Sequence, residues 1–264
     1  MTTTAADVAH HLREAIKRGD LVPGQRLGSN AELVAQYGAG KNTVSKAIGL
    51  LKAEGLLAGT TSAGIHVRTP PPRTVRSNTR YAQEKKLVRA PLEERRCFGS
   101  AEADTDVSVD DLDEDSAHYD VVAADEQVAA ALKVDAGSSV LRRRYSRRYH
   151  ATGGLRPSTS YLPVNLISDN PELFDAGHEP WPGGTMHQLY TVGIEVVYIE
   201  DRVTAVMPSP ETQTEQDIPP GVPVLQIEKI SFTGDDVPVE VTYIPLSAEN
   251  TTLIYRTDLP GWTE

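Results

Sequence analysis

The stretch SNAELVAQYGAGKNTVSKAIGLLKAEGLL, residues 29–57, constrains the fold more than any other part of the chain. It contains two helical patterns separated by a break of only three residues, Gly38-Ala39-Gly40. Ser29 and Glu32 have the spacing of a capping box, in which each side chain binds the other residue's backbone N–H at the start of a helix. The second pattern repeats apolar residues on one helix face: Val44, Ala47, Ile48 and Leu51. Two helices joined by so short a turn predict a helix-turn-helix motif.

The residues on either side of this stretch extend the motif to a small domain. Val8, Leu12 and Ile16 recur every four residues and predict an earlier helix that ends at Gly19. After the motif, LLAGT and GIHVR (residues 56–60 and 64–68) have the pattern of two short strands. We expect the inward side chains of this hairpin to be Leu56, Ile65 and Val67. Three helices and a hairpin predict a winged helix-turn-helix domain over residues 1–69.

The charge of the chain is unevenly distributed. The net charge of −11 argues, taken alone, against a nucleic-acid partner. Residues 1–75, however, hold nine Lys/Arg and five Asp/Glu, a net charge of +4, so the remainder carries −15. The N-terminus shows no secretory signal pattern, no apolar run reaches about 18 residues, and Cys97 is the single cysteine. These features predict a cytoplasmic chain without a membrane partner.

A different pattern follows the helix-turn-helix region. Pro70-Pro71-Pro72 favours a stiff spacer, and the polar, basic segment after it predicts a linker over residues 70–89. Residues 90–264 contain several strand-like segments rich in Val, Ile and Tyr, and two helical ones at 125–134 and 184–192. This mixture predicts an α+β second domain with an antiparallel sheet.

The chain resembles a known family in both parts. LREAIKRGDLVPGQRLGSNAELVAQYGAGKNTVSKAIGLLKAEGLL, followed by GIHV, looks like the DNA-binding domain of GntR-type bacterial regulators. VLRRRYSRRYHATGGLRPSTSYLP and PVLQIEKISFTGDDVPVEVTYIPL are similar to the UTRA effector domain of the HutC subfamily, which has a chorismate-lyase-like fold. The resemblance implies a homodimeric repressor that leaves a palindromic operator when a small molecule binds its second domain.

The candidate DNA-contacting residues surround the start of the second motif helix. A helix N-terminus presents free N–H groups and a partial positive charge, which suit a phosphate. Lys41 suits a guanine edge or a phosphate, and Asn42 suits an adenine edge. The full set is Arg26, Ser29, Gly40, Lys41, Asn42, Thr43, Ser45, Lys46, Gly64 and His66. The chain departs from the family at Ala31, Gly40-Lys41 and Ser45, where the family's usual pattern has arginines or Ser-Arg, so the family's operator contacts do not transfer directly.

The candidate effector residues begin on the strand VLRRRYSRRY. Alternation along a strand places Arg142 and Arg144 on one face, and guanidinium groups suit a carboxylate or phosphate, which favours an anionic effector. The UTRA resemblance also implies contacts from the STSYLP strand and near Glu240. The candidate set is Arg142, Arg144, Ser158, Ser160 and Glu240. Alternatively, these arginines form ion pairs with the many acidic residues of the chain.

No catalytic, cofactor or metal site is predicted. The acidic segment DTDVSVDDLDEDS (residues 104–116) lacks the glycine and terminal glutamate of a calcium loop and predicts a surface loop. The histidines are scattered without zinc-site spacing, and no GxSxG sequence marks a nucleophile. Two alternatives to a ligand-responsive repressor remain. One is a DNA-binding regulator without an effector, and the other is a small-molecule enzyme of chorismate-lyase-like fold.

Overall fold

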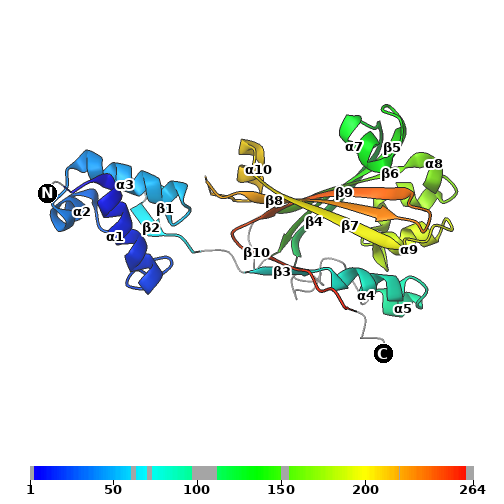
Figure 1. Cartoon of the computed structure of the whole chain (residues 1–264), viewed down its shortest axis with the longest axis horizontal. Coiled ribbons are helices and arrows are strands. Elements are labelled where there is room, and N and C mark those ends of the chain that lie inside the picture. The colour runs from blue at the N-terminus through cyan, green and yellow to red at the C-terminus, as the bar shows by residue number, and fades with distance from the viewer. Residues whose placement is uncertain are drawn as a thin grey trace. The chain divides into compact units, whose positions relative to one another are not determined.

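The computed structural model describes residues 3–60, 64–69, 73–96, 112–149, 155–219 and 221–259. Its contacts divide the chain into two compact units. The first unit combines Met1–Pro71 with Met207–Pro223, and the second combines Pro72–Val206 with Val224–Glu264. Figure 1 labels the helices and strands of both units. No helix in the described part of the chain is both long enough and apolar enough to cross a membrane.

The N-terminal residues of the first unit form the predicted helices and hairpin. The elements of this unit are α1 (Ala5–Arg18), α2 (Asn30–Tyr37), α3 (Lys41–Ala53), β1 (Leu57–Thr60), β2 (Gly64–Val67) and, from the later segment, α10 (Pro210–Glu215). Ser29 caps α2 and forms the predicted capping box with Glu32. Gly38 ends α2 in the left-handed conformation, with a φ of 58°. Since α3 begins at Lys41, the predicted short turn between the two helices is confirmed.

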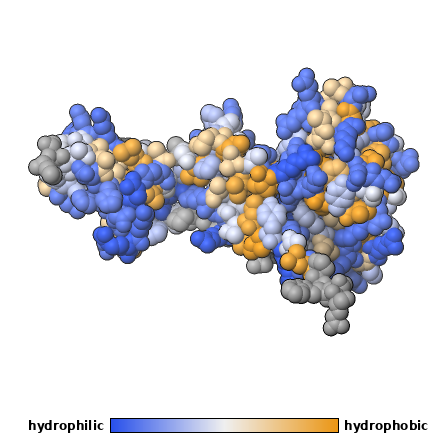
Figure 2. Space-filling model, in the orientation of Figure 1, coloured by the Kyte–Doolittle hydropathy of each residue, from blue (hydrophilic) through white to orange (hydrophobic). Residues whose placement is uncertain are grey.

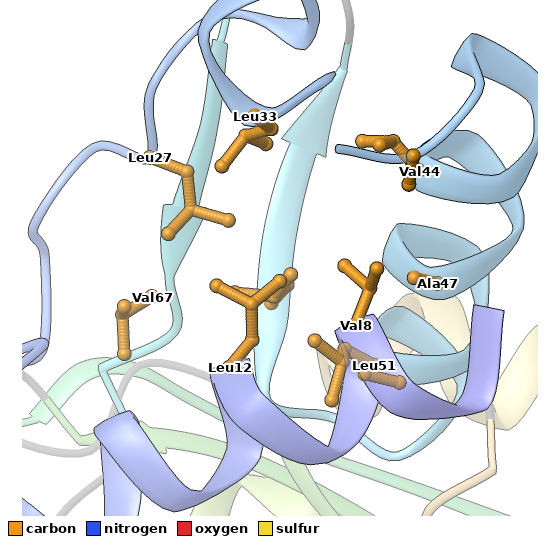
Figure 3. Close-up of a cluster of buried hydrophobic side chains, with 11 residues drawn as sticks. Val8, Leu12, Leu27, Leu33, Val44, Ala47, Leu51 and Val67 are labelled. Atoms are coloured by element: carbon orange, nitrogen blue, oxygen red, sulfur yellow. The ribbon is translucent and has the colours of Figure 1, made fainter. Parts of the chain in front are cut away.

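The core of the first unit lies between α1, α3 and the hairpin, and hydrophilic residues cover most of the unit in the view of Figure 2. Val8 of α1 lies beside Ala47 and Leu51 of α3, whereas Leu12 of α1 lies between Val8 and Val67 of the hairpin (Figure 3). The buried residues are Val8, Ala9, Leu12, Leu27, Leu33, Ala39, Val44, Ala47, Leu51, Leu57 and Val67. The prediction for β1 is corrected by one residue, because Leu57 pairs with Val67 across the hairpin and is buried. Leu56 and Ile65 are only partly buried at the edge of this core.

A six-stranded sheet forms the centre of the second unit. Its strand order is β4-β5-β6-β9-β8-β7, and every neighbouring pair is antiparallel, as the sequence predicts. The strands are β4 (Leu112–Ala123), β5 (Ser139–Tyr149), β6 (Leu155–Pro163), β7 (Tyr198–Val206), β8 (Val224–Phe232) and β9 (Pro238–Ser247). The prediction of a surface loop over the acidic segment is partly corrected, because Leu112–Ser116 belongs to β4; residues 104–111 and Cys97 lie outside the described residues.

Helices pack on both faces of this sheet (Figure 1). One face, which we call the α7 face, packs Val140, Ile230 and Val241 against α7 (Glu126–Leu132). The other, which we call the α9 face, packs Leu141, Leu162 and Val239 against helical elements. Those elements are α8 (Val164–Ile167), η2 (Pro171–Phe174) and α9 (Gly184–Tyr190), and η3 (Ala176–His178) lies between η2 and α9 in the sequence.

The segment interpreted from sequence as a linker contains regular structure that belongs to the second unit. It holds β3 (Thr74–Ser77) and α4 (Thr79–Leu87), and α5 (Leu92–Arg96) follows. The strand β3 pairs in parallel with β10 (Thr251–Ile254), from the other end of the chain. Tyr81 and Val88 pack against the hydrophobic cluster of the α9 face. The second unit is therefore completed by the residues that directly follow Pro72.

Candidate functional sites

One face of α3 is polar and exposed. Lys41, Asn42, Ser45 and Lys46 are exposed, whereas Val44, Ala47 and Leu51 are buried. Residues four apart lie on the same side of a helix, so the exposed residues form one stripe over the first half of α3. Both charged side chains of this stripe, Lys41 and Lys46, are basic. The burial of the apolar face thus fixes which side chains α3 presents outward.

The N-terminus of α3 leaves its first backbone N–H groups accessible to a ligand. Gly40 is the N-cap residue and makes no side-chain cap hydrogen bond, and the first turn holds no acidic residue. Unpaired N–H groups and the helix dipole together favour an anion at such an end. Ser45 accepts a 3.4 Å hydrogen bond from the amide of Asn30, which links the exposed face of α3 to the start of α2. Ser29 and Thr43 lie at the starts of these two helices.

The hairpin places three further predicted residues together. The backbones of Arg26 and His66 form a β-bridge, and the Arg26 guanidinium lies against Gly64, where an added Cβ would come within 2.5 Å of Nε. Gly59 has a φ of 95°, and a Cβ there would lie 2.1 Å from the backbone oxygen of Gly64, so this turn requires glycine. The Lys52 ammonium donates to the Gly59 carbonyl oxygen at 2.6 Å. Lys52 therefore links α3 to the hairpin.

A buried polar cluster centres on Arg143 in the second unit. Arg143 projects from β5 on the α9 face and is only 2% exposed. Its guanidinium donates to Ser160 Oγ at 2.9 Å and to Glu240 Oε1 at 2.8 Å. It also donates to Gln188 Oε1 and Thr185 Oγ1 on α9. Acceptors from β6, β9 and α9 thus converge on this cation, as burial of an arginine requires.

Glu240 joins this arginine to a second cation. The Lys229 ammonium donates to Glu240 Oε2 at 2.8 Å, and the Ser231 hydroxyl donates to the same oxygen at 3.1 Å. Burial would raise the pKa of Glu240, but Lys229 and Arg143 outweigh it and lower the pKa to about 2. Glu240 is therefore a carboxylate at neutral pH, held between two cations inside the unit.

A second carboxylate lies at the other end of the cluster. Glu179 Oε1 accepts hydrogen bonds from the hydroxyls of Tyr119 and Tyr145, the latter at 3.0 Å, and from the Gln188 amide at 3.3 Å. Burial would raise the pKa of Glu179, yet the Tyr119 hydroxyl and the Trp181 backbone N–H lower it. Burial likewise raises the pKa of Tyr119 to about 12. The cluster thus holds two carboxylates, two cations and protonated tyrosines.

The predicted effector residues divide between the two faces of the sheet. Ser160 and Glu240 lie in the buried cluster, and Ser158 pairs with Tyr145 on the same α9 face. Arg142 and Arg144 lie on the α7 face, where they form ion pairs with Asp120 at 2.5 and 3.8 Å. The five residues therefore do not form one constellation, and Arg143 is the arginine that Ser160 and Glu240 contact.

Several members of the cluster were absent from the sequence-based prediction. Glu179 and Gln188 come from a loop and a short helix, and Lys229 comes from β8, far from both in the sequence. Alternation along β5 groups Arg143 with Leu141 and Tyr145, but it does not say which face of the strand is inward. No group of three or more His, Cys, Asp and Glu residues suited to a metal occurs among the described residues.

A single stretch of chain covers this cluster. Residues 179–188 supply Glu179, Thr185 and Gln188, and Trp181 Nε1 donates to His187 Nδ1 at 2.9 Å. Burial, and secondarily Arg95, lower the pKa of His187. The accepted hydrogen bond requires Nδ1 to carry no proton. Neutral His187 therefore links α9, at the end of this segment, to Trp181 near its start through a hydrogen bond.

We predict that the folded chain loses stability in mild acid because of His187 in this segment. The unfolded chain takes up a proton near pH 6.5, whereas the lowered pKa of folded His187 resists it. Stability should therefore fall as the pH decreases through about 6.5, since the unfolded state binds more protons there. Thermal unfolding at pH 7.5 and 5.5 measures the loss. The loss should shrink in His187→Gln, which keeps an acceptor without a titration, and persist in the control His118→Gln. Equal losses in wild type and His187→Gln would contradict the prediction.

Two family models match the chain. The model described as bacterial regulatory proteins, gntR family, matches residues 4–67. The model described as UTRA domain matches residues 114–248. The first match spans α1 to β2, and the second spans the six-stranded sheet with α7, α8 and α9. The first match therefore falls on the first unit, and the second falls on the second unit except for residues 207–223, which belong to the first.

Individual proteins are similar over most of the chain. An uncharacterized HTH-type transcriptional regulator of Streptomyces coelicolor is 25% identical over 244 residues, covering 89% of this chain and 85% of that protein. A crystal structure assigned to the GntR-family transcriptional regulators has a TM-score of 0.66 at 22% identity and covers 98% of both chains. PhnF from Mycobacterium smegmatis has a TM-score of 0.49 at 18% identity, covering 96% of this chain and 100% of that chain. The first of these two structures shows a shared fold.

Proposed function

The chain belongs to the bacterial regulatory proteins of the GntR family that carry a UTRA domain, and we propose that it is a repressor released from its operator by a small molecule. The observation that carries the proposal is the exposed stripe of α3. A helix with a polar, non-acidic first half and an open N-terminus fits the major groove. The first unit would thus bind DNA through Lys41, Asn42, Ser45 and Lys46.

The wing and neighbouring helix would supply the remaining contacts. Arg26, Gly64 and His66 lie together at the hairpin, and Ser29 lies at the start of α2. Contacts to phosphates from such positions fix the orientation of a recognition helix on the duplex. A homodimer would place two copies of α3 on the two halves of a palindromic operator.

The buried cluster of the second unit is the proposed effector site. Arg143, Ser160 and Glu240 converge there from three strands. An anionic effector would compete with Glu240 for the Arg143 guanidinium, because both offer oxygen acceptors to the same donors. A small molecule can shift DNA affinity only if it binds the two states of the protein unequally. Exchange of Glu240 for the effector provides such a difference.

The proposal is tested with DNA selected from a random library by the full-length chain. The selected duplexes should share a palindromic sequence, and the chain should bind them more tightly than scrambled duplexes at the same salt concentration. Pools of cell metabolites are then added to the complex. Release by a fraction that also raises the melting temperature of the free protein supports the proposal. Absence of any preference among duplexes would contradict the DNA-binding assignment, and absence of release would favour a regulator without an effector.

A further inference from the structure

We propose that Tyr81 and Glu84 of α4 couple the buried cluster to β3, the strand that follows the N-terminal segment of the first unit in the sequence. This inference rests on the proposed function, since it concerns how the effector site would influence DNA binding. The strand β3 and the helix α4 together span Thr74–Leu87, close behind the last residues of the hairpin in the sequence. This segment is hydrogen-bonded at two separate points, to α9, which holds Arg143, and to Asp201 of β7, the register partner of Lys229 on β8.

The first point runs through Tyr81. Its hydroxyl donates to the Asp201 carboxylate of β7 at 2.8 Å. Asp201 is the register partner of Lys229 on β8, so the two side chains lie next to each other on the α9 face. Lys229 in turn donates to Glu240 at 2.8 Å. A carboxylate on each side of Lys229 means that a change at Glu240 alters the electrostatic environment of Asp201.

The Tyr81 hydroxyl also accepts a hydrogen bond from β3. Arg76 Nη2 donates to Tyr81 Oη at 2.8 Å, and Arg76 is only 6% exposed. Thr74, two residues earlier and on the same side of β3, is 2% exposed and accepts from Arg156 of β6 at 2.5 Å. Tyr81 is therefore the hydrogen-bonded junction between the strand β3 and the strand β7.

The second point runs through Glu84. Its carboxylate is buried and accepts from the backbone N–H of Met186 at 3.1 Å, within the first turn of α9. A Cβ on Gly184 would lie 2.8 Å from Glu84 Oε1, so the carboxylate rests directly on the start of this helix. Two residues on that helix, Thr185 and Gln188, hold the Arg143 guanidinium. A movement of α9 that accompanies a change at Arg143 is thus passed to α4.

The α7 face provides an internal control. There Tyr243 donates to Glu228 at 3.3 Å, a tyrosine–carboxylate pair in the same sheet. Arg202 also binds Glu228, in a pair that is more exposed (54% and 22%) than the Arg143–Glu240 pair (2% and 1%). These two partners of Glu228 lie on β9 and β7. By contrast, Tyr81 accepts from Arg76 of β3, and Glu84 accepts from the Met186 N–H of α9. Equivalent substitutions on the two faces therefore separate coupling from the loss of any ion-paired carboxylate of the sheet.

The test is hydrogen–deuterium exchange on the full-length chain without ligand. Glu240→Gln removes the central charge while keeping its shape. Amides of Thr79–Leu87 should then exchange about threefold or more faster than in wild type, because their local opening costs less. The matched control Glu228→Gln should leave these amides within experimental error. Equal acceleration in both variants, or an unchanged rate at α4 while α9 amides accelerate, would overturn the proposal.

A second experiment tests the coupling from α4 towards α9. It uses a smaller change than Glu240→Gln, so the proposal can still be tested if Glu240→Gln does not fold. Tyr81→Phe removes one hydroxyl and should accelerate exchange in Gly184–Tyr190, whereas Tyr243→Phe should not.

A third experiment measures DNA affinity with a duplex selected by the wild-type chain. Glu240→Gln should change this affinity when it is the single substitution, but should cause no further change in a chain that already carries Tyr81→Phe. A chain that binds no duplex would contradict the proposed function, while the exchange data would still decide the coupling. Unchanged exchange with normal DNA binding would refute the coupling alone.

Discussion

Arg143→Met is expected to lower the free energy of unfolding of the second unit by about 3–5 kcal/mol, the usual cost of breaking a buried ion pair from one side. The substitution preserves much of the side-chain volume but removes all the donors that Ser160, Gln188 and Glu240 now share. Each acceptor is buried, so none regains water when its donor is lost. Urea denaturation followed by circular dichroism measures the change.

Two comparisons separate this effect from the loss of any arginine. Arg144→Met removes a neighbouring cation whose side chain is 47% exposed and whose ion pair to Asp120 spans 3.8 Å. Its cost should stay below about 1 kcal/mol, as for exposed ion pairs. Combining Arg143→Met with Glu240→Gln should recover part of the loss, since one carboxylate (Glu179) and one cation (Lys229) then remain in the cluster in place of two carboxylates and one cation. Similar costs for Arg143→Met and Arg144→Met would contradict the central position of Arg143.

The first unit was predictable because its signals are local. The capping box of Ser29 with Glu32 and the break at Gly38-Ala39-Gly40 involve residues within a few positions of each other. The buried face of α3 follows from the spacing of Val44, Ala47 and Leu51. The error at Leu56 and Leu57 arose because two adjacent leucines give a short strand no preferred side.

The same ambiguity explains the division of the predicted effector residues. The predicted alternation along β5 is confirmed, but Val140 and Leu141 are both apolar and both buried. Neither face of the strand is therefore marked as inward by the sequence. Tertiary packing decides it, because α9 lies over Leu141 and Arg143 while Arg142 and Arg144 pair with Asp120 on the other side. A shift of one residue moves an arginine from one face to the other.

The structure of the supposed linker could not be predicted from a local pattern. The helix α4 has few apolar residues, and its buried side chains include Arg80 and Glu84. Burial of such groups depends on partners from distant segments, as Glu84 shows with Met186. The pairing of β3 with β10 joins residues from nearly opposite ends of the second unit's sequence. Periodicity carries no information on contacts of this kind.

Replacing Lys41 and Lys46 together by alanine is expected to weaken binding to the selected duplex by about 100-fold at fixed salt. A lost base contact accounts for about 1–3 kcal/mol, and a lost phosphate contact adds to it and reduces the salt dependence of binding by about one unit of slope. Both side chains are exposed, so the fold should be unaffected. Fluorescence anisotropy over a series of salt concentrations measures both quantities.

The decisive control removes the same charge from another helix of the same unit. Lys17 and Arg18 end α1, where they are exposed and pair with Glu14 and Asp20. If the +4 charge of residues 1–75 attracted DNA only at long range, alanine at these two positions would weaken binding as much as alanine at 41 and 46. Contact in the groove instead predicts a loss about tenfold smaller for the α1 pair, because those charges act only through a screened field. Equal losses in the two double variants would therefore remove α3 from the interface.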